Sequence, residues 1–351
     1  MAYTTINKST DYFNTKLYTG NATARNITTG FRPDWVWLKS RSNADHHQLF
    51  DVIRGAEERL YTSLNYAESN NIQALTSFNS DSFSLGTDQY INGSGKTYAS
   101  WNWKANGTGS ANTDGSINST VSVNTTAGFS IVKYTGASNA SGATIGHGLG
   151  AVPKMIIVKE TSASGNNWIV YHHKLPTGTN GVGSYLMLNS TASYSDSTIM
   201  FGNTAPTSAV FSLANDSQTN GSGSTFIAYC FAEKTGYSKF GSYTGNGNAD
   251  GSFIYTGFKP AWIMIKKTND THAWRIYDSA RDTYNVTEKI LEPNTSNAEA
   301  TSSTYIVDLV SNGFKFRGNG DGVNGSGQSF IYMAFAEAPL VGSNNVPCTA
   351  R

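Results

Sequence analysis

The sequence predicts an all-β protein made of three tandem antiparallel β-sandwich repeats of about 105 residues, of the jelly-roll or lectin-like type. Charged residues make up only 14% of the 351 residues and aromatic residues 12%, while glycine (35 residues) is far commoner than proline (8). Such a composition is typical of many short strands joined by tight turns. Three sequence landmarks also recur along the chain, which indicates an internal repeat.

The landmarks follow one another in the same order in each copy. They are Tyr-Thr-Gly at 18–20, 134–136 and 243–245; a proline-containing segment that ends in lysine at 30–39, 150–159 and 257–266; and Asn-Gly-Ser-Gly before an aromatic strand at 92–95, 220–223 and 324–327. This order predicts a triplication whose units are large enough to form their own cores.

These positions set the expected boundaries. We expect an N-terminal arm at 1–11, repeats at 12–105, 128–234 and 235–338, a linker rich in Gly, Ser, Thr and Asn at 106–127, and a C-terminal tail at 339–351.

Within a repeat, the hydrophobic pattern predicts strand after strand. In the second copy, residues 129–134 alternate between apolar and polar positions, and residues 155–158 are apolar throughout, as in a strand buried on both faces. Further strands are expected at 168–171, 185–188 and 210–213, and the closing strand at 226–231. Residues 286–291 are the one segment with a weak helical pattern.

Most tryptophans lie in predicted strands, so we expect them in the core rather than on a sugar-binding surface. Trp35 and Trp37 should share one strand face, with Val36 on the other. Cys230 lies in an apolar run and should be a buried structural thiol. With only Cys348 as a second cysteine, a disulfide framework is excluded.

The net charge of +1 gives no strong field for nucleic acid or an anionic membrane. No apolar run of about 20 residues occurs, so insertion into a membrane is not expected. The first residues lack the pattern of a secretion signal. An extracellular type of composition without an export signal predicts a protein that is assembled in the cytoplasm and released by cell lysis.

Long stretches of the chain, among them GFRPDWVWLK (30–39) and IGHGLG (145–150), are more specific than composition. Together with residues 1–20, 50–55, 75–81, 83–86, 128–136 and 277–281, they closely resemble a module of tailed-bacteriophage virion proteins, especially phages of marine bacteria and cyanobacteria. The resemblance implies lectin-like β-sandwiches that are structural or related to tail fibres, without a known reaction. It supplies no binding residues to carry over.

Two acid–base pairs recur at comparable positions, Asp51 with Arg54 and Asp278 with Arg281. A carboxylate and a guanidinium three residues apart can form a bidentate ligand site, but a salt bridge that holds a turn is the favoured interpretation. The second repeat has Tyr171-His172-His173-Lys174 at the comparable place, so no common chemistry is retained in all copies.

No catalytic, cofactor-binding or metal-binding residues are expected. Adjacent histidines, His46 with His47 and His172 with His173, should point to opposite strand faces and cannot easily hold one ion. The segments 248–251 and 318–322 resemble calcium loops but offer one carboxylate each, which favours turns.

The sequence therefore predicts a non-enzymatic virion protein, either tail-fibre-like or another surface-exposed component. Its loops, rich in hydroxyl and amide groups, suit host surface glycans bound with avidity across the repeats. A capsid decoration or knob protein with a purely structural role is the alternative, and the lack of heptads weakens the fibre interpretation. Other virion proteins, in a homo-oligomer or symmetric assembly, are the expected partners. No glycan-binding residues can be named from sequence.

Overall fold

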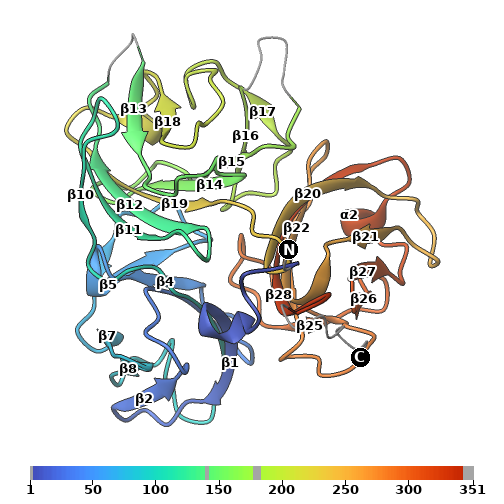
Figure 1. Ribbon diagram of the computed structural model, residues 1–351. Helices are drawn as coiled ribbons and strands as arrows, with labels where there is room; N and C mark the ends of the chain where they lie inside the picture. The colour runs from blue at the N-terminus through green and yellow to red at the C-terminus, as the bar shows by residue number, and fades with distance from the viewer. Residues whose placement is uncertain (1–2, 139–141, 177–182, 343–351) are drawn as a thin grey trace.

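The computed structural model describes residues 3–138, 142–176 and 183–342, and it is all-β with antiparallel sheets, as predicted. Figure 1 shows three lobes, coloured blue to cyan, green to yellow and orange to red, around a common centre. We call them section 1 (residues 12–105), section 2 (106–234) and section 3 (235–339). The only helices in the described ranges are single turns: η1 (Ser9–Asp11), α1 (Ser217–Asn220) and α2 (Asp321–Asn324).

Section 1 contains one large and one small sheet. The large sheet has the order β1 (Phe13–Thr19), β9 (Thr97–Trp103), β3 (Trp35–Ser40), β4 (Gln48–Asp51), β5 (Gly55–Tyr61) and β6 (Ser69–Asn70). The small sheet has the order β2 (Arg25–Thr28), β8 (Ser82–Leu85) and β7 (Leu75–Phe78).

Section 2 is organised in the same way, with additional strands. Its large sheet runs β10 (Ser110–Asn112), β11 (Ser119–Asn124), β12 (Phe129–Thr135), β19 (Thr225–Phe231), β14 (Met155–Glu160), β15 (Ile169–His172), β16 (Ser184–Met187) and β17 (Ser195–Asp196). Its small sheet pairs β13 (Ala143–Gly146) with β18 (Val210–Leu213). The expectation that 106–127 is a linker was wrong, because β10 and β11 extend the large sheet beside β12.

Section 3 has a four-stranded sheet in the order β20 (Ser238–Thr244), β28 (Ser329–Pro339), β22 (Phe258–Lys267) and β23 (Arg275–Asp278). Its small sheet is β21 (Phe253–Tyr255), β27 (Gly313–Phe316) and β26 (Val307–Val310), beside the short pair β24 (Lys289–Ile290) and β25 (Ala300–Thr301). The weak helix expected at 286–291 was therefore wrong, because Lys289 and Ile290 pair with β25 and Leu291 bridges Ile276 of β23.

The repeated landmarks meet one another in each section. The glycine of each Tyr-Thr-Gly lies so close to the Asn-Gly-Ser-Gly turn that any Cβ would collide with a carbonyl oxygen. A Cβ placed on Gly20 would lie 2.2 Å from Gly93 O. The corresponding distances are 2.3 Å between Gly136 and Gly221 O and 2.3 Å between Gly245 and Gly325 O. Glycine is needed here for close backbone approach.

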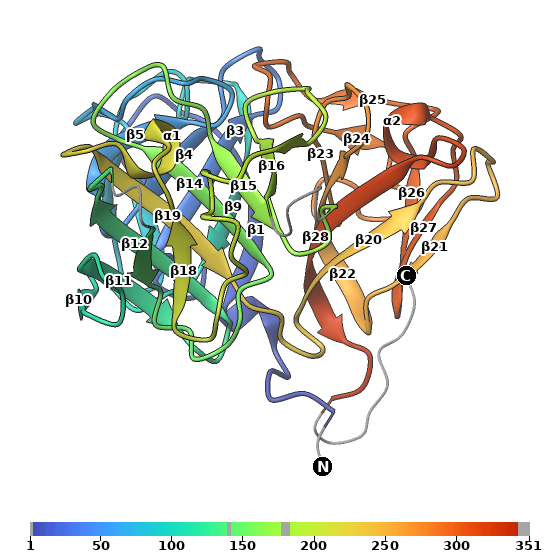
Figure 2. The same ribbon diagram turned by 90° about the horizontal axis from the view of Figure 1, so that it is seen from above.

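Each large sheet buries both faces. One face packs on the small sheet of its own section, so that each section has a separate core between its two sheets. The other face meets the other two sections in one central core that also takes in Ile6 of the N-terminal arm. Figure 2 shows the three sections in a view from above.

All seven tryptophans are at most 1% exposed, as the strand pattern predicted. Trp35 and Trp37 belong to the central core, whereas Val36 faces the small sheet. Cys230 is buried in section 2, and burial raises the pKa of its thiol. Cys348 lies outside the described residues. Among those residues, no helix reaches the length and apolar character needed to cross a membrane.

Candidate functional site

The first predicted pair, Asp51 and Arg54, lies at the end of β4 where section 1 meets section 2. Arg54 Nε donates to Asp51 Oδ2 at 2.6 Å, and Tyr229 Oη of β19 donates to the same oxygen at 2.8 Å. Both partners of the ion pair are at most 1% exposed in their side chains. Burial alone would lower the pKa of Arg54, but the Asp51 carboxylate raises it above its ordinary value.

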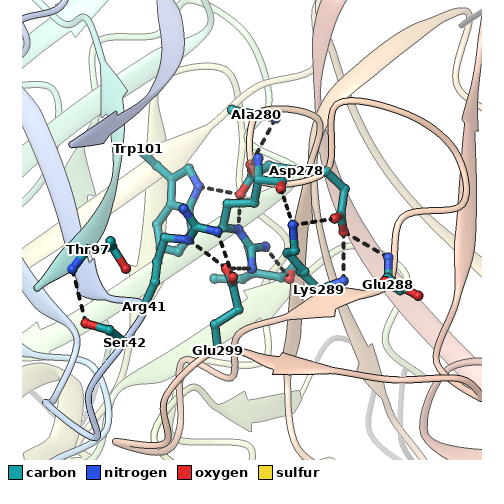
Figure 3. Close-up of polar contacts among 12 residues, drawn as sticks. Arg41, Ser42, Thr97, Trp101, Asp278, Ala280, Glu288, Lys289 and Glu299 are labelled. Carbon is teal, nitrogen blue, oxygen red and sulfur yellow. Dashed lines mark hydrogen bonds and ion pairs between the residues drawn. The ribbon is translucent and has the colours of Figure 1, made fainter. Parts of the chain in front are cut away.

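The second pair, Asp278 and Arg281, repeats this geometry between sections 3 and 1. Arg281 Nε donates to Asp278 Oδ2 at 2.6 Å, and Trp101 Nε1 of β9 donates to that oxygen at 3.0 Å. Arg281 also reaches Glu299 at 3.1 Å, and Arg41 holds the same carboxylate at 2.8 Å. Figure 3 shows Arg41 at Glu299 and Trp101 at Asp278. Burial alone would raise the pKa of Glu299, but the hydrogen bond from Arg41 and the charge of Arg281 lower it.

His172 takes the corresponding place in section 2, since it pairs with Met155 as Asp51 pairs with Trp35. Its Nε2 lies 3.3 Å from Tyr332 O of section 3. The three contacts thus run round the molecule in one direction. Backbone hydrogen bonds repeat the cycle: Glu68 N to Thr161 O at 2.9 Å, Tyr194 N to Thr268 O at 2.7 Å and Glu299 N to Arg41 O at 2.8 Å. The arrangement joins the sections and leaves these pairs no open face for a ligand.

Three buried lysines mark the same junctions, at equivalent positions in β3, β14 and β22. Lys39, Lys159 and Lys266 are each 0% exposed, and each donates to the carbonyl oxygen of the next residue at 2.6–2.7 Å. Burial lowers the pKa of Lys39 and Lys159 to about 8 and that of Lys266 to about 7.

The prediction that adjacent histidines point to opposite faces was wrong for His172 and His173, whose ring centres lie 5.2 Å apart and whose Nε2 atoms both face carbonyl oxygens of section 3. It is confirmed for His46 and His47. His47 accepts from Trp37 Nε1 at 2.9 Å in the interior, whereas His46 lies 2.8 Å from Ser63 Oγ near the surface.

One group of possible metal ligands, Asp270, His272 and Asp321, does occur in section 3. The Lys267 ammonium lies 3.1 Å from Asp270 and 2.7 Å from Asp321. It fills the place between the carboxylates, so the group as found is an ion-pair cluster.

An open cavity lies on the outside of section 1, over the ends of β4 and β5. This cleft has a volume of about 700 Å³ and is lined by Ala44, Asp45, His46, Gln48, Arg59, Tyr61, Leu64, Tyr66, Ser69 and Tyr90. The volume is within the range of small-molecule sites. Tyr66 and Tyr90 are 54% and 52% exposed, which is unusual in a chain whose aromatic residues are mostly buried.

Gln48 lies at the bottom of the cleft. It is only 1% exposed, and its Oε1 is buried without a hydrogen-bond partner among the described residues. A buried unpartnered carbonyl costs about 1–3 kcal/mol and is therefore rare. The strand alternation places Gln48, Tyr61 and Arg59 on the same side of adjacent strands, because Gln48 pairs directly with Tyr61. Because this oxygen is closed to solvent, a ligand in the cleft would reach it only after the Gln48 amide turns.

The tyrosines of the cleft are positioned by charged neighbours. The Arg59 guanidinium lies 5.0 Å from the centre of the Tyr61 ring, and Lys96 Nζ lies 5.9 Å from that of Tyr90. Burial raises the pKa of Tyr61, so its phenol stays protonated at neutral pH. Aromatic faces beside polar groups are suited to the two kinds of surface on a sugar.

The site residues singled out in the sequence, Asp51, Arg54, Asp278 and Arg281, are thus brought to the junctions and not to the cleft. Sequence reasoning missed the cleft itself. Tyr66 and Tyr90 stand outside the apolar runs and could have been noticed as exposed aromatics, but no signal marks Gln48, whose unpartnered state exists only in three dimensions.

A family model described as a domain of unknown function (DUF7483) matches residues 8–339. No curated protein and no solved structure matches the chain.

Proposed function

The chain belongs to the DUF7483 family, which is described as a domain of unknown function. We propose that it is a non-enzymatic component of a bacteriophage virion that binds host surface glycans. The cleft of section 1 carries the proposal, because it combines three tyrosines with a buried, unpartnered amide oxygen of Gln48. The resemblance of long stretches to virion modules supports the place of action. The protein would be assembled in the host cytoplasm and released by lysis.

We also propose that the three sections are copies of one β-sandwich. In each section the strand that carries Tyr-Thr-Gly pairs with the closing strand, which pairs in turn with the lysine-ending strand. The tyrosines occupy equivalent places: each donates its hydroxyl to a carbonyl near the Asn-Gly-Ser-Gly turn, Tyr18 to Ile91 O, Tyr134 to Thr219 O and Tyr243 to Val323 O.

A glycan array followed by titration with the best ligand tests the proposed binding. Tyr66→Ala and Tyr90→Ala should each weaken binding by about threefold to tenfold, because a stacking aromatic contact is lost. Tyr255→Ala is the matched control, since Tyr255 is 53% exposed but lies on β21 of section 3. Equal effects of all three substitutions, or binding to no glycan, would contradict the proposal.

A structural role as a capsid decoration or knob protein is the second candidate. The observation that favours it is the extent of the junctions, where buried ion pairs and one shared core join all three sections. Attachment of the purified chain to capsid shells, without glycan binding, would support this role.

A further inference from the structure

We infer that the cleft of section 1 takes an uncharged sugar, and that Asp45 and Asp88 make it selective by neutralising its two cations. The inference rests on the proposed glycan binding and adds the class of ligand and the residues that set it. The sugar would place a hydroxyl against Gln48 and its apolar face on the tyrosines.

The ligand group at Gln48 follows from the amide itself. Its Oε1 needs a donor, and an amide turned by 180° would instead present an N–H that needs an acceptor. A hydroxyl can donate or accept, so it satisfies either orientation. A carboxylate accepts only and would repel the Oε1 carbonyl.

The charges around the cleft compensate one another in pairs. Lys96 Nζ lies 3.1 Å from Asp45 Oδ2, and Arg59 Nη1 lies 3.5 Å from Asp88 Oδ2. Burial, and then the nearby charge of Lys39, lowers the pKa of His46, so its imidazole is uncharged at neutral pH. Arg59 and Lys96, the two cations beside the cleft, are thus each paired with a carboxylate and not available to an acidic sugar.

The two carboxylates differ in what else they hold. Asp88 Oδ1 accepts from the backbone N–H groups of Tyr90 and Ile91, so its loss would also disturb the turn. Within the described residues, the Asp45 side chain makes one hydrogen bond, which its Oδ2 accepts from Lys96. Asp45→Asn is therefore the substitution that releases a cation without removing a turn.

The experiment compares matched oligosaccharides that differ only in a hydroxymethyl or a carboxylate group, such as galactotriose and trigalacturonate, together with the gluco and manno pairs. The unsubstituted protein should prefer the neutral member of the pair that it binds by about tenfold. Asp45→Asn should tighten binding of the acidic partner to within about threefold, and this gain should disappear at high salt. The quantity compared is the ratio of the acidic to the neutral affinity, which Asp45→Asn should raise and which a general disturbance of the cleft would leave as it is.

Asp250→Asn serves as the control, because it releases Lys315, 2.6 Å away, in section 3 and outside the cleft. It should leave both affinities as they are. If the unsubstituted protein prefers the acidic partner, or if Asp45→Asn changes nothing, the inference is wrong while glycan binding stands. If no member of any pair and no glycan on the array binds, the proposed function fails and the inference fails with it.

Discussion

Sections 1 and 3 place different side chains at the same position of the same ladder. Gln48 pairs with Leu38 in section 1, and Arg275 pairs with Ile265 in section 3. The Arg275 guanidinium lies 3.8 Å from the centre of the Tyr305 ring and donates to Gly322 O at 3.2 Å. Gln48 Oε1 has no such partner, although Arg275 Nε is also buried without one. The position is thus filled by internal contacts in section 3, whereas in section 1 it holds a buried amide under the cleft.

The cores between the sheets differ in the same sense. Among the described residues, the core between the two sheets contains 9 buried hydrophobic residues in section 1, 17 in section 2 and 15 in section 3. Section 2 has Ile169 at the position of Gln48, and it is 0% exposed. The smaller core of section 1 therefore leaves room for the cleft. The lysines at the junctions, by contrast, are the same in all three sections.

The largest effect is expected at the junctions. Arg281→Met would leave the Asp278 carboxylate buried without its cation, which costs about 3–5 kcal/mol of unfolding free energy. Urea denaturation measures this loss, and glycan affinity at the cleft should not change. Arg317→Met is the control, because Arg317 pairs with Asp308 at 2.7 Å but is 45% exposed; we expect a loss of about 0–1 kcal/mol there. Lost binding at unchanged stability would make Arg281 a ligand residue.

A second prediction concerns pH and the junction lysines. The pKa of Lys266 is about 7 in the folded chain, whereas the pKa of a lysine in an unfolded chain is about 10.4. Between these values the folded state releases its proton first, so the unfolded state binds more protons and stability rises with pH. Lys266→Met should reduce this slope by about 1 kcal/mol per pH unit between about pH 7 and 10.

Denaturation curves at several pH values measure the slope. Lys8→Met is the control, because the Lys8 side chain is 72% exposed and should leave the slope unchanged. A slope that Lys266→Met does not alter would mean that Lys266 is solvated, and the contrast between closed junctions and an open cleft would weaken.

Much of the fold could be predicted because strand patterns are local. The alternation of Trp35, Val36 and Trp37 placed the tryptophans inside, and the apolar run around Cys230 placed that thiol in a core. The segment 106–127 was misread, because its many polar residues hide two strands, β10 at the edge of the sheet and β11 beside it, whose Val121 belongs to the core of section 2. Pairing with β12, and not composition, decides its structure.

The junctions and the cleft depend on contacts between distant parts of the chain. Asp278 meets Trp101 across 177 residues, and Asp51 meets Tyr229 across 178. The sequence indicated the ion pairs, since their members lie three residues apart, but not the aromatic donors that complete them. Gln48 could not be identified from the sequence, because its role rests on the lack of a hydrogen-bond partner for its Oε1 among the described residues.

The smallest expected change in unfolding free energy belongs to the most direct test of the comparison. Gln48→Leu removes the unpartnered amide, and it should therefore raise the unfolding free energy by about 1 kcal/mol while abolishing glycan binding. Ile169→Gln makes the reverse change at the equivalent position of section 2 and should destabilise by at least as much, because it buries a new amide in a filled core. Urea denaturation and titration with the best glycan measure both. If Gln48→Leu lowers stability instead, Gln48 is a structural residue, and the position in section 1 is no different in kind from the filled position of section 3.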